Sequence, residues 1–346
     1  MILKHQFNMK PENMNTRTQW IDSLKAIAIF WIYLGHFGDN GKQLYQFAFS
    51  FHVPLFFFIS GLFYKKCNSI SELLSIIKNS FIKLIIPYFI FSIISLVFFS
   101  LYNNSSVDQV KEMALQILPA IRNQIFAASL WFLPCLFSMI TIYSIILLAI
   151  KNKHVIFLVC LTTFIMSTKL QLGFVPSLFF NIDSALLYIV YYALGAYISG
   201  YIRNRELTPE NRYKYTALLL IVTISVAVFI YSYFFGAGSI YKYIQSETIR
   251  ILLSFVVTVL LFVPNIVLSK YMTLTPILEI GRYTLVLCGT EQLIKTLIYS
   301  TFNMFGMSIY LHNPVDTIVY TLICLLISYF TTIKAYKFLY NKKQAL

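Results

Sequence analysis

Three ionisable side chains stand in the first long apolar stretch of the chain: Asp22, Lys25 and His36. At about 100° per residue, the eleven steps from Lys25 to His36 return to within roughly 20° of the same direction, and Asp22 lies within about 60° of Lys25. A helix here therefore carries all three groups on one face, with His36 about 16 Å further along the axis than Lys25. Ionisable groups within a membrane span are costly, so this face must look into protein rather than lipid.

This arrangement suits the transfer of a group from a charged donor to a hydroxyl. An imidazole serves as a general base near neutral pH, and a cation holds an anionic group such as a coenzyme phosphate. We predict His36 and Asp22 as catalytic residues and Lys25 as a cofactor-binding residue, with Lys25 and His36 lining one protein-enclosed cavity. The helix alone leaves an alternative open: His36 hydrogen-bonds a neighbouring helix, Lys25 reaches to the interface, and Asp22 helps to start the helix.

Two further positions in the second apolar stretch are candidates for substrate binding or support. His52 stands beside Pro54 at a depth where a reacting group could lie, although a lone histidine is also a common packing residue. Ser60 precedes Gly61, and this pair predicts a close helix contact, because small residues let two backbones approach. A role for Ser60 as a nucleophile would need a neighbouring base that the sequence does not supply.

Later apolar stretches contain a few more charges, and we predict that these neutralise one another. Glu291 is expected to pair with Lys295, one helical turn further on. Asp183 and Arg250 have opposite signs, and pairing would lower the cost of burying both.

The composition places these residues in a membrane protein. Of the 346 residues, 58% are hydrophobic and 12% are charged, and the mean hydropathy is +0.73, which does not describe a soluble surface. Apolar stretches near the length that crosses a bilayer recur along the whole chain, so we predict an all-α, polytopic bundle of about ten transmembrane helices. The expected spans are residues 20–37, 44–64, 84–102, 128–150, 154–170, 176–202, 215–236, 247–269, 280–301 and 314–333.

The net charge of +14 is distributed by side of the membrane and does not indicate a nucleic-acid partner. Most Lys and Arg residues fall on one set of alternate joints, which includes both termini; the opposite joints hold Lys42, Lys111, Arg122, Lys169 and Lys242. The positive-inside rule then places both termini in the cytoplasm. We expect residues 1–19 to form a cytoplasmic segment without a removable signal peptide and residues 20–340 to form the transmembrane domain, with no separate soluble domain.

Two joints are long enough to hold structure of their own. Residues 69–83 suit an amphipathic helix on the inner leaflet, ahead of the span that Pro87 opens. Residues 103–129 suit a lid or a re-entrant helix, or equally an outer surface helix without a role in binding. Of the five cysteines, four lie in apolar spans and none belongs to a C-x-x-C or other metal-ligand spacing, so we predict neither disulfides nor a metal site.

Three motifs together resemble acyltransferase family 3, particularly its fucose O-acetylase-like branch. They are Asp22-Ser-Leu-Lys-Ala-Ile-Ala28 with His36, then Phe51-His-Val-Pro-Leu-Phe-Phe-Phe-Ile-Ser-Gly61, then Leu130-Trp-Phe-Leu-Pro134. The resemblance implies that Lys25 and His36 are the functional pair of the first span and that Trp131, in the third motif, supports the substrate.

The resemblance also assigns roles to two later positions. Lys78 and Lys83, ahead of Pro87, correspond to a basic cluster that would bind the nucleotide end of the donor. Glu291 stands where the family commonly has a histidine, so a carboxylate here either replaces that imidazole or simply pairs with Lys295.

What the family implies is the transfer of an acyl group, usually acetyl from acetyl-CoA, to hydroxyls of surface polysaccharides or lipid-linked glycans. We therefore predict an O-acetyltransferase of the bacterial cytoplasmic (inner) membrane, with acetyl-CoA as donor, a glycan acceptor and surrounding membrane lipid as partners. Two alternatives stay open: a secondary transporter or glycan flippase, which would also bury a few charges in a ten-span bundle, and an inactive family member that acts as a scaffold.

Overall fold

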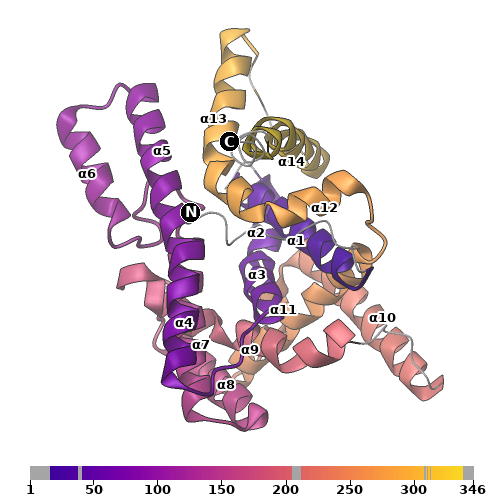
Figure 1. Cartoon of the computed structure of the whole chain (residues 1–346). Helices are drawn as coiled ribbons and strands as arrows, with labels where there is room; N and C mark the ends of the chain where they lie inside the picture. Colours follow the sequence, from indigo (N-terminus) through magenta and orange to yellow (C-terminus); the bar gives the residue numbers. More distant parts are fainter. Residues whose placement is uncertain are drawn as a thin grey trace. The chain divides into compact units, whose positions relative to one another are not determined.

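The computed structural model describes residues 16–37, 41–204, 212–307, 309, 311 and 313–337. Every regular element in these residues is a helix (Figure 1), which confirms the predicted all-α class. The elements are α1 (Thr16–Gly35), α2 (Lys42–Phe49), α3 (His52–Gly61), α4 (Ile70–Ser80), η3 (Phe81–Ile85), α5 (Ile86–Tyr102), α6 (Val107–Ile117), α7 (Phe132–Ala149), α8 (Lys153–Lys169), η4 (Phe179–Asn181), α9 (Ile182–Asn204), α10 (Arg212–Phe235), η5 (Ala237–Ile240), α11 (Glu247–Ser269), α12 (Thr275–Arg282), α13 (Thr284–Met304), α14 (Pro314–Ser328) and η6 (Tyr329–Ile333).

Seven helices among the described residues are long and apolar enough to cross a membrane, so the chain is a polytopic membrane protein. All ten expected spans contain helix, but α1, α8 and α13 are not among the seven. Helix α8, for example, has 17 residues and is about 25 Å long, slightly short of a hydrocarbon core of about 30 Å. The count of ten spans and the cytoplasmic position of the termini stay predictions.

The chain divides into two compact units, which are described separately. In the described part of the chain, unit 1 comprises residues 60–199 and 288–293, and unit 2 comprises residues 16–59, 200–287 and 294–337. Unit 1 therefore contains α4 to α8, most of α9 and residues 288–293 of α13, whereas unit 2 contains α1, α2, most of α3 and the rest of the helices after α9. The range 20–340, expected as one transmembrane domain, covers both units.

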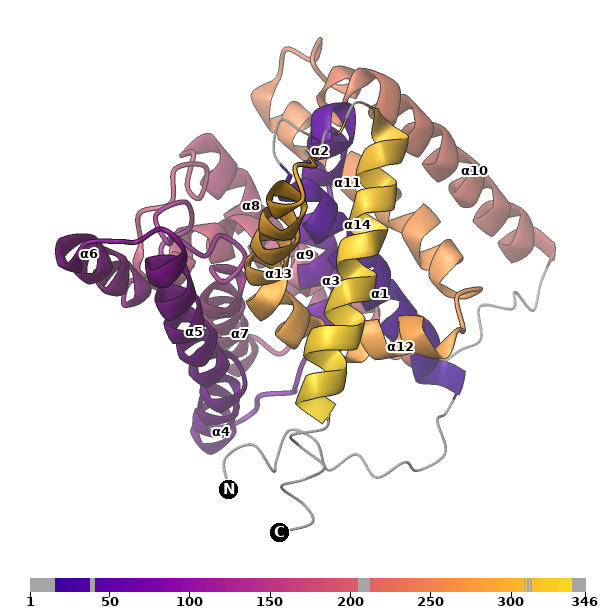
Figure 2. The same cartoon turned by 90° about the horizontal axis from the view of Figure 1, so that it is seen from above.

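Unit 2 is built around α1, which packs against α2, α11, α12 and α14; Figure 2 shows α14 running alongside α1. An aromatic cluster packs α1 against α2, the turn before α3 and α10: the centroid of the Trp31 ring lies 5.6 Å from that of Phe47, 5.3 Å from that of Phe51 and 6.5 Å from that of Phe229, in each case edge to face. The Trp31 indole N–H donates to Asn265 on α11 at 2.9 Å. This packing fixes α1 and the side chains that it carries.

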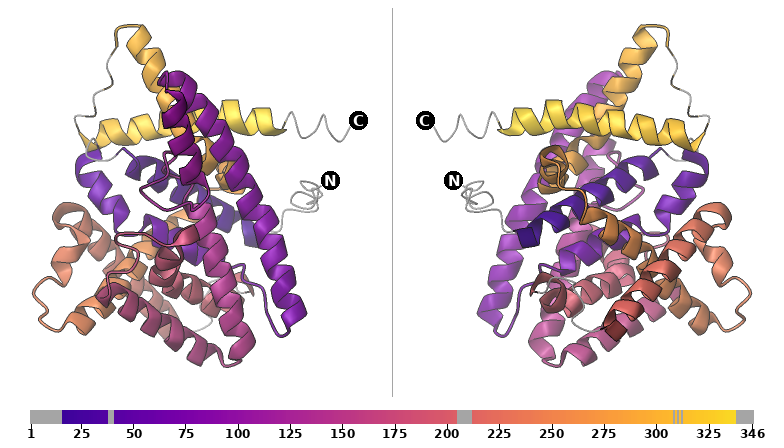
Figure 3. Two further views of the ribbon diagram at one scale, coloured as in Figure 1. Left: turned by 90° about the vertical axis from the view of Figure 1, so that its left-hand side faces the viewer. Right: turned by 90° about the vertical axis from the view of Figure 1, so that its right-hand side faces the viewer.

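Unit 1 contains a long continuous helix made of α4, η3 and α5, from Ile70 to Tyr102, which Figure 3 shows as one rod. Its first part packs against α7. The expected helix over residues 69–83 is therefore present as α4 and η3, but it is continuous with the span that follows; its position on the inner leaflet stays a prediction. The π-turn at Phe81–Ile85 has a physical cause, because Pro87 lacks an N–H and its ring would clash with the Lys83 carbonyl in a regular α-helix. Widening the turn relieves the clash without breaking the rod.

The long joint over residues 103–129 contains α6, which has 11 residues, is largely exposed and packs against α5. A surface helix is therefore present there. The end of this joint meets the joint between α8 and α9: Phe180 N–H donates to Pro119 O at 2.8 Å, and Arg122 N–H donates to the Asn181 side chain at 2.7 Å. Two joints that the charge pattern places on one side thus lie together.

Candidate active site

The predicted functional side chains of α1 lie in two separate environments. Asp22 and Lys25 are half-buried near the start of the helix, and His36 is half-buried in the turn directly after Gly35. The His36 main-chain N–H donates to Ile32 O at 3.1 Å and so continues the helical hydrogen-bond pattern. Both ends are accessible in part, whereas most of the helix between them is buried.

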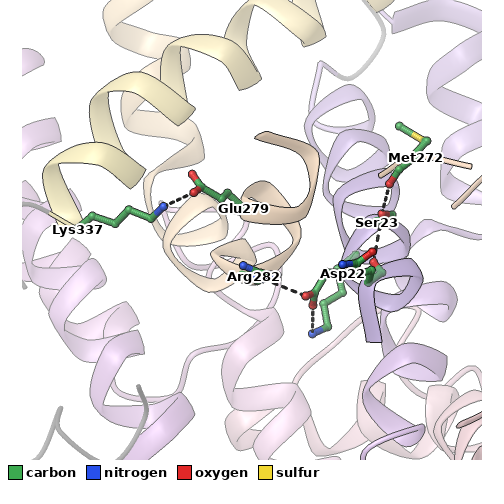
Figure 4. Close-up of polar contacts among 8 residues, drawn as sticks. Asp22, Ser23, Met272, Glu279, Arg282 and Lys337 are labelled. Atoms are coloured by element: carbon green, nitrogen blue, oxygen red, sulfur yellow. Dashed lines mark hydrogen bonds and ion pairs between the residues drawn. The ribbon is translucent and has the colours of Figure 1, made fainter. Parts of the chain in front are cut away.

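At the start of α1, a single carboxylate holds two cations. Lys25 Nζ lies 3.3 Å from one oxygen of Asp22, and Arg282 Nε, on α12, lies 3.1 Å from the other (Figure 4). The Ser23 hydroxyl donates to the Met272 carbonyl and ties the segment before α12 to α1. Arg282 was not among the predicted site residues; its place at one end of an expected span was the signal available in the sequence.

Helix α12 is held against α1 by close backbone contact. A Cβ added at Gly281 would lie 1.8 Å from the Asp22 carbonyl oxygen, so only glycine fits. Glu279 on the same helix accepts hydrogen bonds from Lys337 at 2.5 Å and from the Tyr329 hydroxyl at 2.9 Å. Two ion pairs thus join α12 to the start of α1 and to the end of the last described helix.

The pKa of Glu279 follows from these contacts. Burial by itself would raise the pKa of the carboxyl, but hydrogen bonds from Lys337 and Tyr329, together with the charges of Lys337 and Lys334, outweigh it and lower the pKa below its ordinary value. Glu279 is therefore a carboxylate at neutral pH and a stable partner for the cations around it.

Asp22 lies far from His36 along the helix. The two residues are 14 positions apart, which is about 21 Å along the axis. Its carboxylate contacts Lys25 and Arg282, so in this structure Asp22 positions two cations. The predicted catalytic role of Asp22 stays a prediction.

Lys25 and His36 do share a helix face, but the face is filled between them. Ile29 and Ile32 occupy it at the intervening turns and are 0% and 6% exposed. No water-sized space reaches Ile29, so the helix face is closely packed at this turn. A ligand that joined the ammonium and the imidazole along this face would have to displace these side chains, and the shared cavity stays a prediction.

His52, the first residue of α3, lies near the C-terminal end of α1, beside Gly35. Its imidazole is 2% exposed, and a Cβ added at Gly35 would lie 3.6 Å from both Cε1 and Nε2 of the ring. The ring also packs edge to face on Phe49, with centroids 4.7 Å apart. The two predicted histidines are therefore brought to the same end of α1.

The hydrogen bond of His52 fixes its tautomer. Nδ1 lies 2.7 Å from the Ala48 carbonyl oxygen, and a carbonyl can only accept, so Nδ1 carries the proton. In the neutral ring the lone pair is then on Nε2, the nitrogen that faces Gly35. The bond is available because the second span is interrupted between α2 and α3, where Phe51 N–H reaches Ala48 O three residues back at 3.1 Å.

Lys295 adds a cation at the same end of α1, where the sequence had suggested only a partner for Glu291. Its ammonium donates to Tyr33 O at 2.6 Å and lies 4.1 Å from the centroid of the Phe37 ring. It therefore provides a hydrogen-bond donor for one of the last carbonyls of α1. Its positive charge also interacts favourably with the negative end of the helix dipole. Its place within an apolar span was the signal available in the sequence.

The remaining predicted residues belong to unit 1. Lys78 and Lys83 are exposed on α4 and η3, Ser60 is half-buried, and Trp131 at the start of α7 is 7% exposed. Glu291 on α13 is fully buried. The roles assigned to these residues, including the pairing of Glu291 with Lys295, stay predictions.

Beside Ser60, the predicted close helix contact is confirmed. A Cβ at Gly61 would lie 2.0 Å from the Tyr192 carbonyl oxygen on α9. This contact is consistent with the structural interpretation of the Ser60-Gly61 pair.

The expected neutralisation of Asp183 by Arg250 is not needed in the structure. The Asp183 carboxylate accepts the main-chain N–H groups of Ser177 and Ser184 at 2.7 Å and of Leu178 at 3.2 Å, while Arg250 is exposed on α11. Main-chain donors stabilise a buried carboxylate as a cation would, and an exposed guanidinium carries little cost.

Taken by class, the molecule is a polytopic helical membrane protein with histidines at one end of a central helix and paired charges at the other. Comparison with known families is more specific: residues 18–333 match the acyltransferase 3 family, described as an acyltransferase domain. The chain belongs to this family, and it is a membrane acyltransferase. No curated protein and no solved structure matches the chain.

Proposed function

We propose that this protein is an O-acyltransferase, in the first instance an O-acetyltransferase, which moves the acyl group of acyl-CoA to a hydroxyl of a surface polysaccharide or lipid-linked glycan. We place it in the bacterial cytoplasmic membrane, with the donor reaching it from the cytoplasm. The family supports acyl transfer; the donor, the acceptor and the membrane are our inference from the sequence pattern and the site.

The observation that carries the proposal is that His36 and His52 lie at the same end of α1. His36 takes the proton of the acceptor hydroxyl as its oxygen attacks the thioester carbon. The C–S bond then breaks, and the imidazolium returns the proton to the thiolate, which leaves as free CoA thiol. His52, with its proton held on Nδ1, orients the site through Nε2, and Lys295 supplies positive charge near the developing oxyanion.

The donor must bring its thioester to this end of α1 from the end that carries Lys25. Ile29 and Ile32 fill the face between the two, so entry of the donor's pantetheine arm requires these side chains to move aside. Binding of the donor would then shift the protein toward a conformation in which the face is open. This opening is part of the proposed reaction cycle.

A transporter would use a broken span differently. In transporters, unwound backbone carbonyls at mid-membrane coordinate the coupling ion. Here the carbonyls at the interruption of the second span are already bonded: Ala48 O by His52, and Ser50 O by the Thr258 hydroxyl at 3.3 Å. Pro54, which has no N–H, leaves Ser50 O without its helical donor, and Thr258 replaces it. This arrangement favours an enzyme site over an ion site.

The test is thiol release by the purified full-length protein in detergent with labelled acetyl-CoA and a mixture of glycan acceptors. His36→Ala should lower the rate by a factor on the order of 10² to 10⁴, as expected for removal of a general base. His154→Ala is the matched control, because that histidine is exposed on α8, is hydrogen-bonded to Tyr197 of the same unit, and is not among the residues proposed for the site. Release that does not depend on His36 would refute the mechanism.

His52 is tested as a positioning residue by its pH dependence. His52→Asn retains an amide N–H to donate to Ala48 O but has no basic nitrogen. We expect a lower rate of thiol release and a shifted pH dependence of that rate relative to wild type, with an unchanged circular dichroism spectrum. An unchanged pH dependence would show that His52 serves only in packing.

A further inference from the structure

The charges around α12 form a group that the proposed chemistry at His36 does not use. We define the α12 charge cluster as six described residues from three parts of unit 2: Asp22, Lys25, Glu279, Arg282, Lys334 and Lys337. Four of these side chains are cationic and two are anionic, so the cluster has an excess of positive charge. On charge pattern alone, it lies at the end of α1 that faces the cytoplasm.

Arg282 is the residue of the cluster best placed to meet a ligand. Its Nε contacts Asp22, its side chain is 39% exposed, and a guanidinium suits planar, bidentate contact with phosphate. Lys25, on the other oxygen of the same carboxylate, is 27% exposed. One carboxylate thus sets two cations side by side at an accessible surface.

The cluster is also rigid, which favours binding because little order has to be created. The backbone of Gly281 lies against that of Asp22, and Pro276 fixes the first turn of α12. At the far side of the short helix, Glu279 is held by Lys337 and Tyr329. The guanidinium of Arg282 is therefore presented from a pinned helix rather than from a loop.

We propose that the α12 charge cluster binds the phosphates of the 3′-phosphoadenosine diphosphate end of coenzyme A, with Arg282 as the main phosphate ligand beside Lys25. This inference rests on the proposed function, and it places the nucleotide end of the donor in unit 2. It competes with the prediction from family resemblance, which places that end at Lys78 and Lys83 in unit 1.

The experiment measures binding of coenzyme A and of pantetheine, which has no phosphates, to the full-length protein in detergent by isothermal titration calorimetry. Wild type should prefer coenzyme A over pantetheine. Arg282→Gln should lose at least tenfold in coenzyme A affinity and most of that preference, whereas Arg282→Lys, which keeps the charge but not the fork, should lose less. The double variant Lys78→Gln/Lys83→Gln should bind coenzyme A as wild type does.

Two controls make the result specific to this cluster. Arg250→Gln removes an exposed arginine elsewhere in unit 2 and should leave coenzyme A affinity within twofold of wild type. His36→Ala should also bind coenzyme A normally, so that loss of the chemistry and loss of the donor site give different results. Melting temperatures of all variants separate binding defects from misfolding.

The proposal is overturned if Arg282→Gln binds coenzyme A as tightly as wild type. It is also overturned if Arg250→Gln weakens binding equally, since the effect would then be general electrostatics, or if the loss appears only in Lys78→Gln/Lys83→Gln. Normal binding at the cluster without any His36-dependent thiol release would support this inference while refuting the proposed function.

Discussion

Two buried or half-buried aspartates, one in each unit, are stabilised by different kinds of partner. Asp22 in unit 2 is held by the side chains of Lys25 and Arg282, and 17% of its own side chain is exposed. Asp183 in unit 1 is 2% exposed and is held by three main-chain N–H groups. The first set of contacts can be exchanged for a ligand without unfolding anything; the second cannot.

The difference separates binding charges from structural charges. Side-chain cations swing away from a carboxylate at small cost, because half-exposed ion pairs contribute little to stability. Main-chain donors are fixed by the fold, so the carboxylate that they hold also fixes the fold. In this molecule, Asp183 anchors the turn between residues 177 and 184, while Asp22 holds two cations side by side.

We expect the largest effect from a substitution that breaks the contacts of Asp183 with main-chain N–H groups. In Asp183→Asn, an amide NH₂ replaces one of the acceptor oxygens and faces main-chain donors, so buried N–H groups lose their acceptor, and we expect a loss of about 3 kcal/mol of stability. Asp22→Asn is the matched substitution and should cost about 1 kcal/mol or less. Thermal unfolding in detergent measures both.

The comparison fails if the two asparagine variants are destabilised equally. In that case the exposure of a carboxylate and the kind of its donors would not decide its role. A large loss of coenzyme A binding in Asp22→Asn together with a small change in melting temperature would sharpen the comparison.

A somewhat smaller effect comes from the backbone contact that pins the charge cluster. Gly281→Ala puts a methyl group against the Asp22 carbonyl, and overpacking of this kind costs about 2 kcal/mol. α12 must shift, so coenzyme A affinity should also fall. Gly200→Ala is the control, because nothing lies within 4 Å of a Cβ at that position. Equal behaviour of the two variants would show that α12 is not pinned.

The smallest effect is the pH dependence of the Glu279 pair. The pKa of Glu279 is lowered in the folded protein, so its contribution to stability is present above the unfolded pKa, near the ordinary value of 4.5, and is lost as pH falls through the lower folded value. Glu279→Gln should therefore be less stable than wild type by about 1 kcal/mol at neutral pH. The difference should vanish in acid; a gap that persists there would mean that packing, not charge, is responsible.

The fold class could be predicted from the apolar stretches alone, because a chain in lipid that forms no closed β-barrel satisfies its backbone only as helices. The course of the individual helices could not be predicted in the same way. Pro87 was expected to open a span, yet the helix runs through it from Ile70 to Tyr102, since a π-turn absorbs the proline. Whether a helix breaks or adapts at proline depends on packing against α7, which a single sequence does not state.

The candidate site was predicted in part. The spacing of Lys25 and His36 placed both on one face, and periodicity cannot tell that Ile29 and Ile32 would fill the space between them. Arg282 and Lys295 join the site only through tertiary contacts with Asp22 and Tyr33, which are more than 200 positions away along the chain. The sequence can identify costly charges, but their partners are set by how the helices meet.

The rod from Ile70 to Tyr102 has 33 residues and is about 50 Å long, against a hydrocarbon layer of about 30 Å. Some four turns of it must therefore stand in headgroups or water, or the whole rod must lean steeply. Where Lys78 and Lys83 come to rest is then decided by bilayer thickness as much as by protein contacts. The test introduces single cysteines from residue 70 to residue 84 and labels them with a water-soluble maleimide in thin and in thick lipid bilayers. The position at which labelling stops should differ between the two bilayers.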